Sequence, residues 1–280
     1  MNARTLAWIM ILGGLFSMPA SLQAEAVSDA LAGEFAAALA DFDRAQQLMA
    51  EHPESARPLF RAAAQRMESL AARAPNGHLE YNIGNAFLQA GDIGRAILHY
   101  RRAERFVPRD GLLADNLREA RSRSLLPIKA GARDRVLGTL FFWHYQTAQR
   151  ERAYVVMATF LLLWIALAIR LFFRQRALTV TAILCAVVCL ISGASVLTQM
   201  WGDRHAPAGV ILAMDVAAYK GPGTSYQRQF EQPLQPGVEF MLRERRGQWW
   251  HMELPDGKSG WIDAADADLV VTERAFAQNG

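Results

Sequence analysis

The fold of this chain is decided by residues 77–108, which read GHLEYNIGNAFLQAGDIGRAILHYRRAERFVP. Three small residues recur at positions where two helices must cross closely, Gly84, Ala96 and Ala103. Large apolar residues lie between them, at positions that would pack against a neighbouring helical hairpin. Gly91 interrupts the helical period in the middle of the stretch, and Pro108 stops it at the end. The stretch therefore predicts a hairpin of two helices.

The spacing of these residues resembles the tetratricopeptide repeat of about 34 residues. The repeat's small, aromatic and proline positions are filled in order by Gly84, Phe87, Gly91, Ala96, Tyr100, Ala103 and Pro108. Glu80 stands where the family has a tryptophan. The resemblance implies an all-α helical-repeat domain that binds other proteins and carries out no chemistry.

In this repeat family the first helix of each hairpin lines a concave groove. The family's groove positions fall here on Tyr81, Asn82 and Asn85, which are the candidate partner-binding residues. Asparagine suits hydrogen bonding to an extended peptide backbone. Helix capping or contacts within the stack account for Asn82 equally well.

Basic residues outnumber acidic ones between residues 95 and 135, although the net charge of the whole chain is only +3. This net charge is too small to argue for a nucleic-acid partner. The basic stretch fits either a solvated helix face or a surface that meets anionic lipid head groups or an acidic partner. We expect Arg101, Arg102 and Arg105 on the outer surface, where they would steer an acidic partner.

The first residues have the pattern of an export signal. Arg4 precedes the apolar residues 6–16, and no acidic residue occurs before Glu25. The sequence therefore predicts a secretory signal peptide over residues 1–26. A buried core helix is the alternative.

Residues 27–124 are predicted to form the exported tetratricopeptide repeat domain. Two amphipathic stretches, 29–49 and 54–73, look like a degenerate repeat before the clear one, because one hairpin cannot bury its own hydrophobic face. Residues 110–124 supply a polar-backed helix that can cap the stack. Residues 125–150 are predicted as a linker followed by an aromatic segment that lies in the membrane interface.

Residues 151–201 are predicted to form two transmembrane helices joined by a tight turn, because two apolar runs of roughly twenty residues lie there. Arg170, Arg174 and Arg176 at the turn favour a cytoplasmic position for it, and Arg150 and Arg152 at the other end oppose this. The export signal is the better guide, and cleaved or uncleaved it gives the same topology. Both soluble regions would then lie on the outer, periplasmic side of a bacterial cytoplasmic membrane, with membrane lipid as a partner.

The two cysteines, Cys185 and Cys189, lie four residues apart in the second apolar run and share one face of a helix. They cannot cross-link a fold from there. Their small size suits close packing of helices in the membrane. Metal or redox use is the alternative.

Residues 205–273 change to the alternating pattern of strands, with turn signals at 221–223, 246–247 and 256–257. This predicts a small all-β barrel. The region resembles the bacterial SH3 family, whose order of residues is matched by Val216, Tyr219, Gly221-Pro222, Tyr226, Gly237, Trp249-Trp250, Gly257 and Gly260-Trp261-Ile262. The family's Asn-Val-Arg before the Gly-Pro pair is missing, so no arginine contact carries over.

The aromatic residues of this barrel divide into two predicted sets. Tyr219, Tyr226 and Trp250 are the candidate residues of a ligand groove, whereas Trp249 and Trp261 are expected in the core. A core position for all of them is the alternative.

No catalytic residue, metal site or cofactor is predicted. The six histidines are scattered with no pair at metal-ligand spacing, and no phosphate loop, dinucleotide fingerprint or nucleophile elbow occurs. Bacterial SH3 modules often accompany cysteine peptidases that cut cell wall. That enzyme hypothesis fails because both cysteines lie in a predicted span.

The order of exported repeat, two-span hairpin and SH3-like barrel, together with residues 81–117, closely resembles the BatE family of aerotolerance-operon membrane proteins. The resemblance implies a non-enzymatic scaffold that works with von Willebrand A-domain membrane proteins and a MoxR-type ATPase in stress tolerance. The alternative is an envelope protein that holds peptidoglycan through its SH3 domain.

Overall fold

The computed structural model of the chain describes residues 20–124, 147–173 and 175–271, with side chains from residue 31 onward. Most of the predicted signal peptide, and the predicted linker and interfacial segment up to residue 146, lie outside the described residues. The chain divides into two units, Met1–Ala74 and Pro75–Gly280. Each unit is described by itself.

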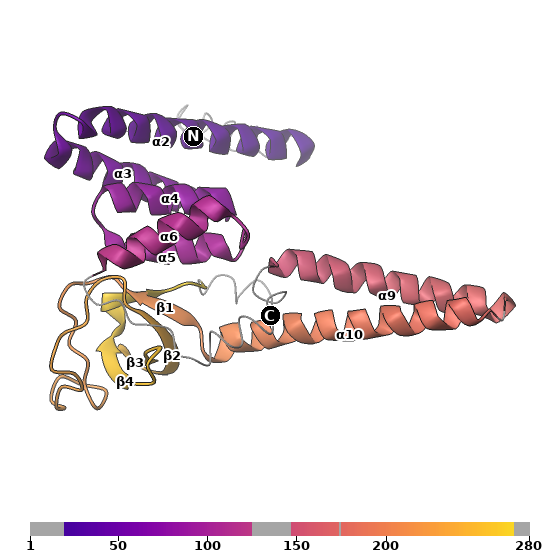
Figure 1. Cartoon of the computed structure of the whole chain (residues 1–280). Coiled ribbons are helices and arrows are strands. Elements are labelled where there is room, and N and C mark those ends of the chain that lie inside the picture. Colours follow the sequence, from indigo (N-terminus) through magenta and orange to yellow (C-terminus); the bar gives the residue numbers. More distant parts are fainter. Residues whose placement is uncertain (1–19, 125–146, 174, 272–280) are drawn as a thin grey trace, which may run out of the picture. The chain divides into compact units, whose positions relative to one another are not determined.

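The first unit contains two helices, α2 (Ala20–Met49) and α3 (Pro53–Ala71), which run side by side as a hairpin (Figure 1). Proline is tolerated in the first turn of α3 because its missing N–H would be unpaired there in any case. Phe42 meets Phe60 edge to face, with ring centroids 5.1 Å apart. The other buried side chains of the two helices include several alanines and two large apolar residues, namely Ala38, Ala45, Ala56, Ala63, Ala64, Met67 and Leu70. The two helices predicted before the repeat stretch are therefore confirmed.

Three helices open the second unit, α4 (Gly77–Gln89), α5 (Ile93–Glu104) and α6 (Gly111–Arg123). Each begins at a capping side chain that accepts a hydrogen bond from a free backbone N–H, at Asn76, Asp92 and Asp110 respectively. Gly91, between α4 and α5, has a positive φ of 77° that glycine adopts without strain. The predicted helical hairpin and the helix after it are therefore confirmed.

The crossing of α4 and α5 depends on the absence of a side chain at Gly84. A Cβ atom there would lie 2.5 Å from the ring of Tyr100. Both Tyr100 and its neighbours in the seam, Ile83, Phe87 and Ile97, are fully buried. The small and large positions of the sequence pattern thus face each other across the hairpin.

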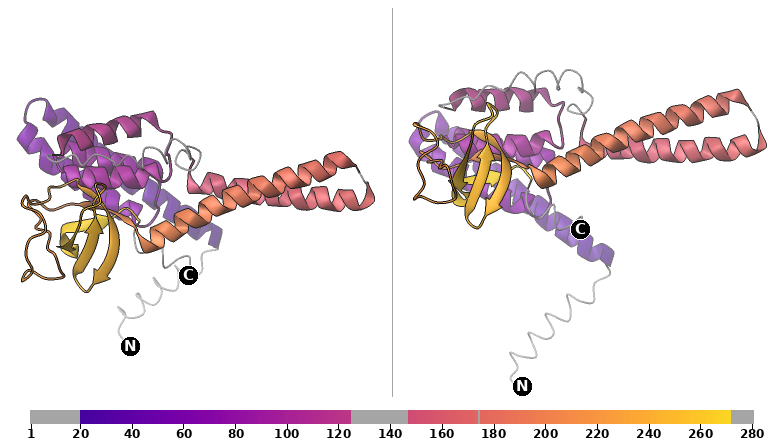
Figure 2. Two further views of the ribbon diagram at one scale, coloured as in Figure 1. Left: turned by 60° about the horizontal axis from the view of Figure 1, so that its bottom comes forward. Right: turned by 90° about the horizontal axis from the view of Figure 1, so that it is seen from below.

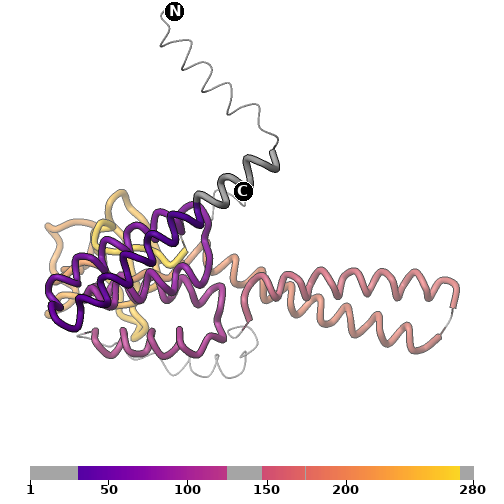
Figure 3. The backbone as a smooth tube through the Cα atoms, turned by 90° about the horizontal axis from the view of Figure 1, so that it is seen from above, coloured from indigo at the N-terminus to yellow at the C-terminus, as the bar shows by residue number. Residues whose placement is uncertain are grey.

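Two long helices follow, α9 (Gln149–Phe172) and α10 (Arg176–His205), which lie alongside each other over most of their length (Figure 2 and Figure 3). Both are long and apolar enough to cross a membrane. Their large apolar side chains point outward and are exposed, among them Met157, Phe160, Trp164, Ile183, Leu190 and Leu197. Exposed apolar surfaces of this extent are typical of contacts with a membrane or with another protein.

The rest of the second unit is a five-stranded antiparallel sheet. Its strands are β1 (Ala208–Ile211), β2 (Glu239–Arg246), β3 (Trp249–Glu253), β4 (Ser259–Asp263) and β5 (Ala267–Leu269), with the short helix η1 (Ala264–Asp266) before β5. The strand order is β4-β3-β2-β1-β5. Gly247 and Gly257 have positive φ values in the two hairpin turns, where the sequence predicts them.

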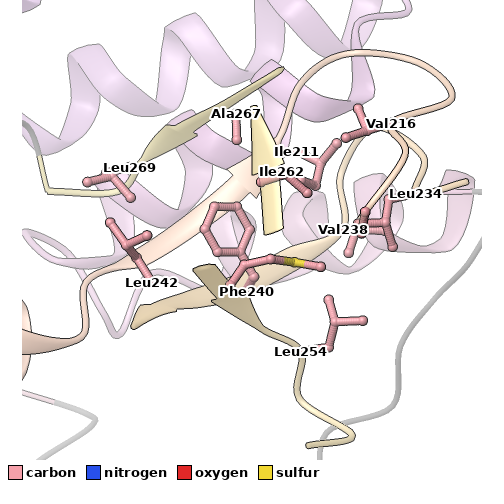
Figure 4. Close-up of a cluster of buried hydrophobic side chains, with 12 residues drawn as sticks. Ile211, Val216, Leu234, Val238, Phe240, Leu242, Leu254, Ile262, Ala267 and Leu269 are labelled. Carbon is pink, nitrogen blue, oxygen red and sulfur yellow. The ribbon is translucent and has the colours of Figure 1, made fainter. Parts of the chain in front are cut away.

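One face of the sheet is covered by its own apolar side chains and by those of the loop between β1 and β2. Figure 4 shows Phe240 near the middle of this cluster, with Ile211, Ile262 and Leu242 around it. The sheet also lies against the helices of the same unit, where α5 contacts β1 (Figure 1). The described part of the chain is therefore helical, with two candidate spans and a small antiparallel sheet.

Candidate partner-binding surfaces

The predicted groove residues of α4 belong to a hydrogen-bonded cluster with α5 and α6. The hydroxyl of Tyr100 donates to Asn85 Oδ1 at 2.8 Å. The amide of Asn116, on α6, donates to the same oxygen at 2.9 Å and to the hydroxyl of Tyr81 at 2.9 Å. Burial, together with the nearby Tyr81, raises the pKa of Tyr100, so its hydroxyl stays protonated as a donor.

Two of the three candidate groove residues, Tyr81 and Asn85, take part in this cluster. Tyr81 and Asn85 lie together, and Asn85 uses its carbonyl oxygen inside the molecule. Asn82 is half-buried on the same helix. Asn116 completes the cluster and is absent from the sequence-based set. The pattern of residues 110–124 identifies a capping helix but does not show which of its side chains faces α4.

A second polar pair is fully enclosed in the hairpin. Glu80 and His99 are 7% and 1% exposed, and the carboxylate Oε2 lies 2.7 Å from the imidazole Nδ1. The imidazole also stacks on Phe87, with centroids 5.5 Å apart. The carboxylate of α4 is therefore paired with a histidine one helix away.

Two arginines, one on α5 and one on α6, bind the carboxylate of Glu239 on β2. Arg121 donates from Nε and Nη2 to the two carboxylate oxygens of Glu239, at 2.7 and 3.0 Å. Arg101 Nε lies 3.1 Å from the same carboxylate. Burial alone would raise the pKa of Glu239, but the charges of Arg101 and Arg121 outweigh it and hold the pKa below its ordinary value.

Arg102 attaches the same helix to the edge strand β5. Its Nη2 donates to the Asp268 carboxylate at 2.9 Å and to the carbonyl oxygen of Leu269 at 2.8 Å. The Arg102 side chain is only 12% exposed. The Asp268 side chain is 49% exposed, so the ion pair is partly screened by water, and the second bond, to a backbone carbonyl, adds to the attachment.

Two glycines let α5 approach the sheet closely. A Cβ at Gly94 would lie 2.8 Å from the carbonyl oxygen of Ile211, and a Cβ at Gly237 would lie 2.8 Å from Ile97. Gly237 also has a positive φ of 89°. The helix therefore rests directly on the backbone of β1 and of the loop before β2.

Arg105 attaches the end of α5 to the end of α10. Its two terminal nitrogens donate to both carboxylate oxygens of Asp203, at 3.0 and 2.7 Å. Arg109 adds a more exposed pair with Glu151 of α9, at 2.7 Å. Such a bidentate pair fixes orientation as well as distance.

These contacts correct the expectation for Arg101, Arg102 and Arg105. They were predicted on the outer surface, where they would steer an acidic partner. In the structure they are held by acidic residues of this same chain. The sequence could not show this, because these carboxylates lie about one hundred to one hundred and seventy residues farther along the chain.

The aromatic residues of the sheet divide between its two faces. Trp250 packs against the apolar cluster on the inner face, with the Arg245 guanidinium 5.5 Å above its ring. Trp249 faces the other way and meets Tyr219 edge to face, with centroids 5.8 Å apart. Trp261 is buried between His251, stacked at 4.9 Å, and the guanidinium of Arg246 at 5.2 Å.

Of the predicted groove set, Tyr219 therefore lies beside Trp249, and Trp250 lies on the core side. Trp249, expected in the core, lies on the face opposite the apolar cluster. Side chains alternate along β3, so Trp250 shares the inner face with the buried Met252, and Trp249 shares the other face with His251. Tyr226 lies apart from this pair in sequence and covers Gly221, where an added Cβ would meet its ring at 2.5 Å.

In the part of the chain that the structure describes, no three histidine, cysteine, aspartate or glutamate residues are grouped so that they could hold a metal ion. Comparisons with protein-family models, curated proteins and solved structures found no match to the chain.

Proposed function

We propose that this chain is a non-enzymatic membrane scaffold that assembles other envelope proteins. The proposal includes a tetratricopeptide-type groove on α4 and α6 and an SH3-like sheet. It places both soluble regions on the outer side of a bacterial cytoplasmic membrane. The partners are von Willebrand A-domain membrane proteins and a MoxR-type ATPase, as the BatE resemblance implies.

The arginine attachments of α5 carry this proposal. Arg101, Arg102 and Arg105 hold the helix to β2, β5 and α10 respectively. The helical hairpin thereby becomes one body with the sheet and the end of a candidate span, while Tyr81 and Asn82 belong to α4, the other helix of the hairpin. A fixed presentation of one helix surface at a membrane is what a scaffold needs, because preorganisation lowers the entropy cost of binding.

The test uses the full-length chain in detergent and purified von Willebrand A-domain membrane proteins. Asn82→Arg places a large charge in the proposed groove without removing any of the described hydrogen bonds of the Asn85 cluster. We expect it to weaken A-domain binding at least tenfold. The matched control is Arg118→Gln, on the exposed face of α6, which should bind as the parent does.

Equal binding by the Asn82→Arg variant and the parent would exclude the groove. Failure of any A-domain protein to bind the parent would exclude the scaffold hypothesis in its present form.

A second candidate function is attachment to peptidoglycan through the sheet. Tyr219 and Trp249 form a partly exposed aromatic pair on the face opposite the apolar cluster. Aromatic side chains with one apolar body and one polar edge are common at binding surfaces. Retention of the full-length chain by isolated sacculi, lost in Trp249→Ala, would favour this function.

A further inference from the structure

A hollow of about 390 Å³ lies where α10 meets the sheet. Its walls are the last turn of α10, with Arg204 and His205, and the middle of β2, with Arg243, Glu244 and Arg245. Small-molecule sites have volumes of about 300–1,000 Å³. The hollow is thus large enough for a small polar group.

The two walls are fixed to each other through a very short connection. Only residues 206 and 207 separate the end of α10 from the start of β1. The N–H of Ala206 donates to Gly202 at 2.8 Å, and the carbonyl of Pro207 accepts from the N–H of Leu242 at 2.9 Å. The second of these hydrogen bonds joins the connection directly to β2.

The lining of the hollow is positively charged. Three arginines and a histidine line it together with one carboxylate, Glu244, which is paired with Arg246 at 2.6 Å, while Arg243 is paired with Glu253 at 2.7 Å. The β2 register shift occurs between Leu242 and Glu244, on this wall. Such bulges re-aim side chains at functional edges of sheets. An anion is the chemistry that this lining favours.

The hollow lies at the end of a candidate membrane span, which favours a lipid head group as the anion. Trp201, one turn before His205 on α10, is 65% exposed and stacks on the His205 ring with centroids 4.6 Å apart. Exposed tryptophans at the end of a membrane helix lie at the depth of the lipid head groups. A hollow one turn beyond Trp201 is therefore beside those head groups.

We propose that this hollow binds the head group of an anionic phospholipid such as phosphatidylglycerol, with its phosphate held by Arg204. The inference rests on α9 and α10 crossing a membrane and does not depend on the scaffold's protein partners. It differs from the basic stretch predicted from the sequence, whose arginines at 101, 102 and 105 are held by carboxylates of this chain.

The test measures binding of short-chain fluorescent phosphatidylglycerol to the full-length chain in a non-ionic detergent. A basic residue near an anionic membrane surface contributes about 1 kcal/mol, which is roughly a fivefold change in affinity. We therefore expect Arg204→Gln to weaken binding about fivefold. Arg204 is exposed at the helix end, so this substitution leaves the fold intact. Arg228→Gln, on the exposed loop between β1 and β2, is the control and should bind as the parent does.

Two further probes separate the sources of the anion. Phosphatidylcholine, which has no net charge, should bind much more weakly than phosphatidylglycerol, and inorganic phosphate should not compete at millimolar concentrations. Equal affinity of Arg204→Gln and the parent would overturn the proposal. So would equal binding of the two lipids, or competition by inorganic phosphate, which would indicate a site for a free anion.

Discussion

Replacement of Glu239 by glutamine should loosen the attachment of α5 to the sheet. The Arg121 side chain is 44% exposed and that of Glu239 is 26% exposed, so this pair is worth about 1 kcal/mol, the upper end for surface ion pairs. Arg101 is 31% exposed and forms an ion pair with the same carboxylate at 3.1 Å, which is also worth about 1 kcal/mol. The loss is therefore about 2 kcal/mol, which is roughly a thirtyfold change in the equilibrium for local opening.

The measurement is amide hydrogen exchange of the full-length chain in detergent. The N–H of Gly237 donates to the carbonyl of Ile211 at 2.8 Å, directly beneath α5. We expect its exchange to become about thirty times faster in Glu239→Gln. Glu119→Gln removes a fully surface pair with Arg123 and is the matched control, with a change of less than about twofold. Unchanged exchange at Gly237 would show that these arginines do not hold the helix.

The same attachment should depend on pH. The pKa of Glu239 is lower in the folded protein than in the unfolded chain, where a glutamate titrates near about 4.3. Its contribution is therefore complete above that pH and is lost as the pH falls through the lower, folded-state pKa. Acid should speed Gly237 exchange in the parent and have less effect in Glu239→Gln. An equal acid response in both proteins would assign it to other carboxylates.

Three further predictions concern the hairpin and the candidate spans. Gly84→Ala should destabilise the α4–α5 hairpin by roughly 1–3 kcal/mol, because its Cβ would lie 2.5 Å from Tyr100. Gly111→Ala is the control and should be tolerated, since its Cβ meets no atom within 4 Å. Thermal unfolding followed by circular dichroism measures both. Reporters that are active only in the periplasm should work after Arg123 and after Gly280 and fail at Gln175; the opposite pattern would reverse the proposed topology. Cys185→Ala with Cys189→Ala should keep the protein's level and function in cells, since packing there needs only small side chains, and loss of function at unchanged level would indicate thiol chemistry.

The helices could be predicted from local pattern because each carries its own signals. The caps of α4, α5 and α6 and the break at Gly91 all lie within the residues they organise. The long apolar helices and the glycine turns of the sheet are equally local. The identities of the helical and β regions as repeat and SH3-like domains stay predictions, because they rest on resemblance.

What the sequence could not show are pairings between distant residues. Glu80 is visible as a departure from the repeat pattern, yet its burial against His99 depends on how two helices cross. The faces of Trp249 and Trp250 depend on which of two adjacent tryptophans shares the inner face with Met252, and the sequence shows the alternation without showing which face is covered. The carboxylates that hold α5 come from three later elements.

The last turns of α10 set the orientation of the sheet relative to α9. Arg152 of α9 donates to Ser195 Oγ at 2.7 Å and also to Gln199, whereas Asp203, one turn later, holds Arg105. Successive residues of an α-helix are rotated by about 100° about its axis. One residue inserted between Gln199 and Asp203 would therefore rotate the sheet and the helices that contact it by about 100° about α10. The number of residues in that single turn therefore determines how the sheet and the helices that contact it are oriented about the axis of α10.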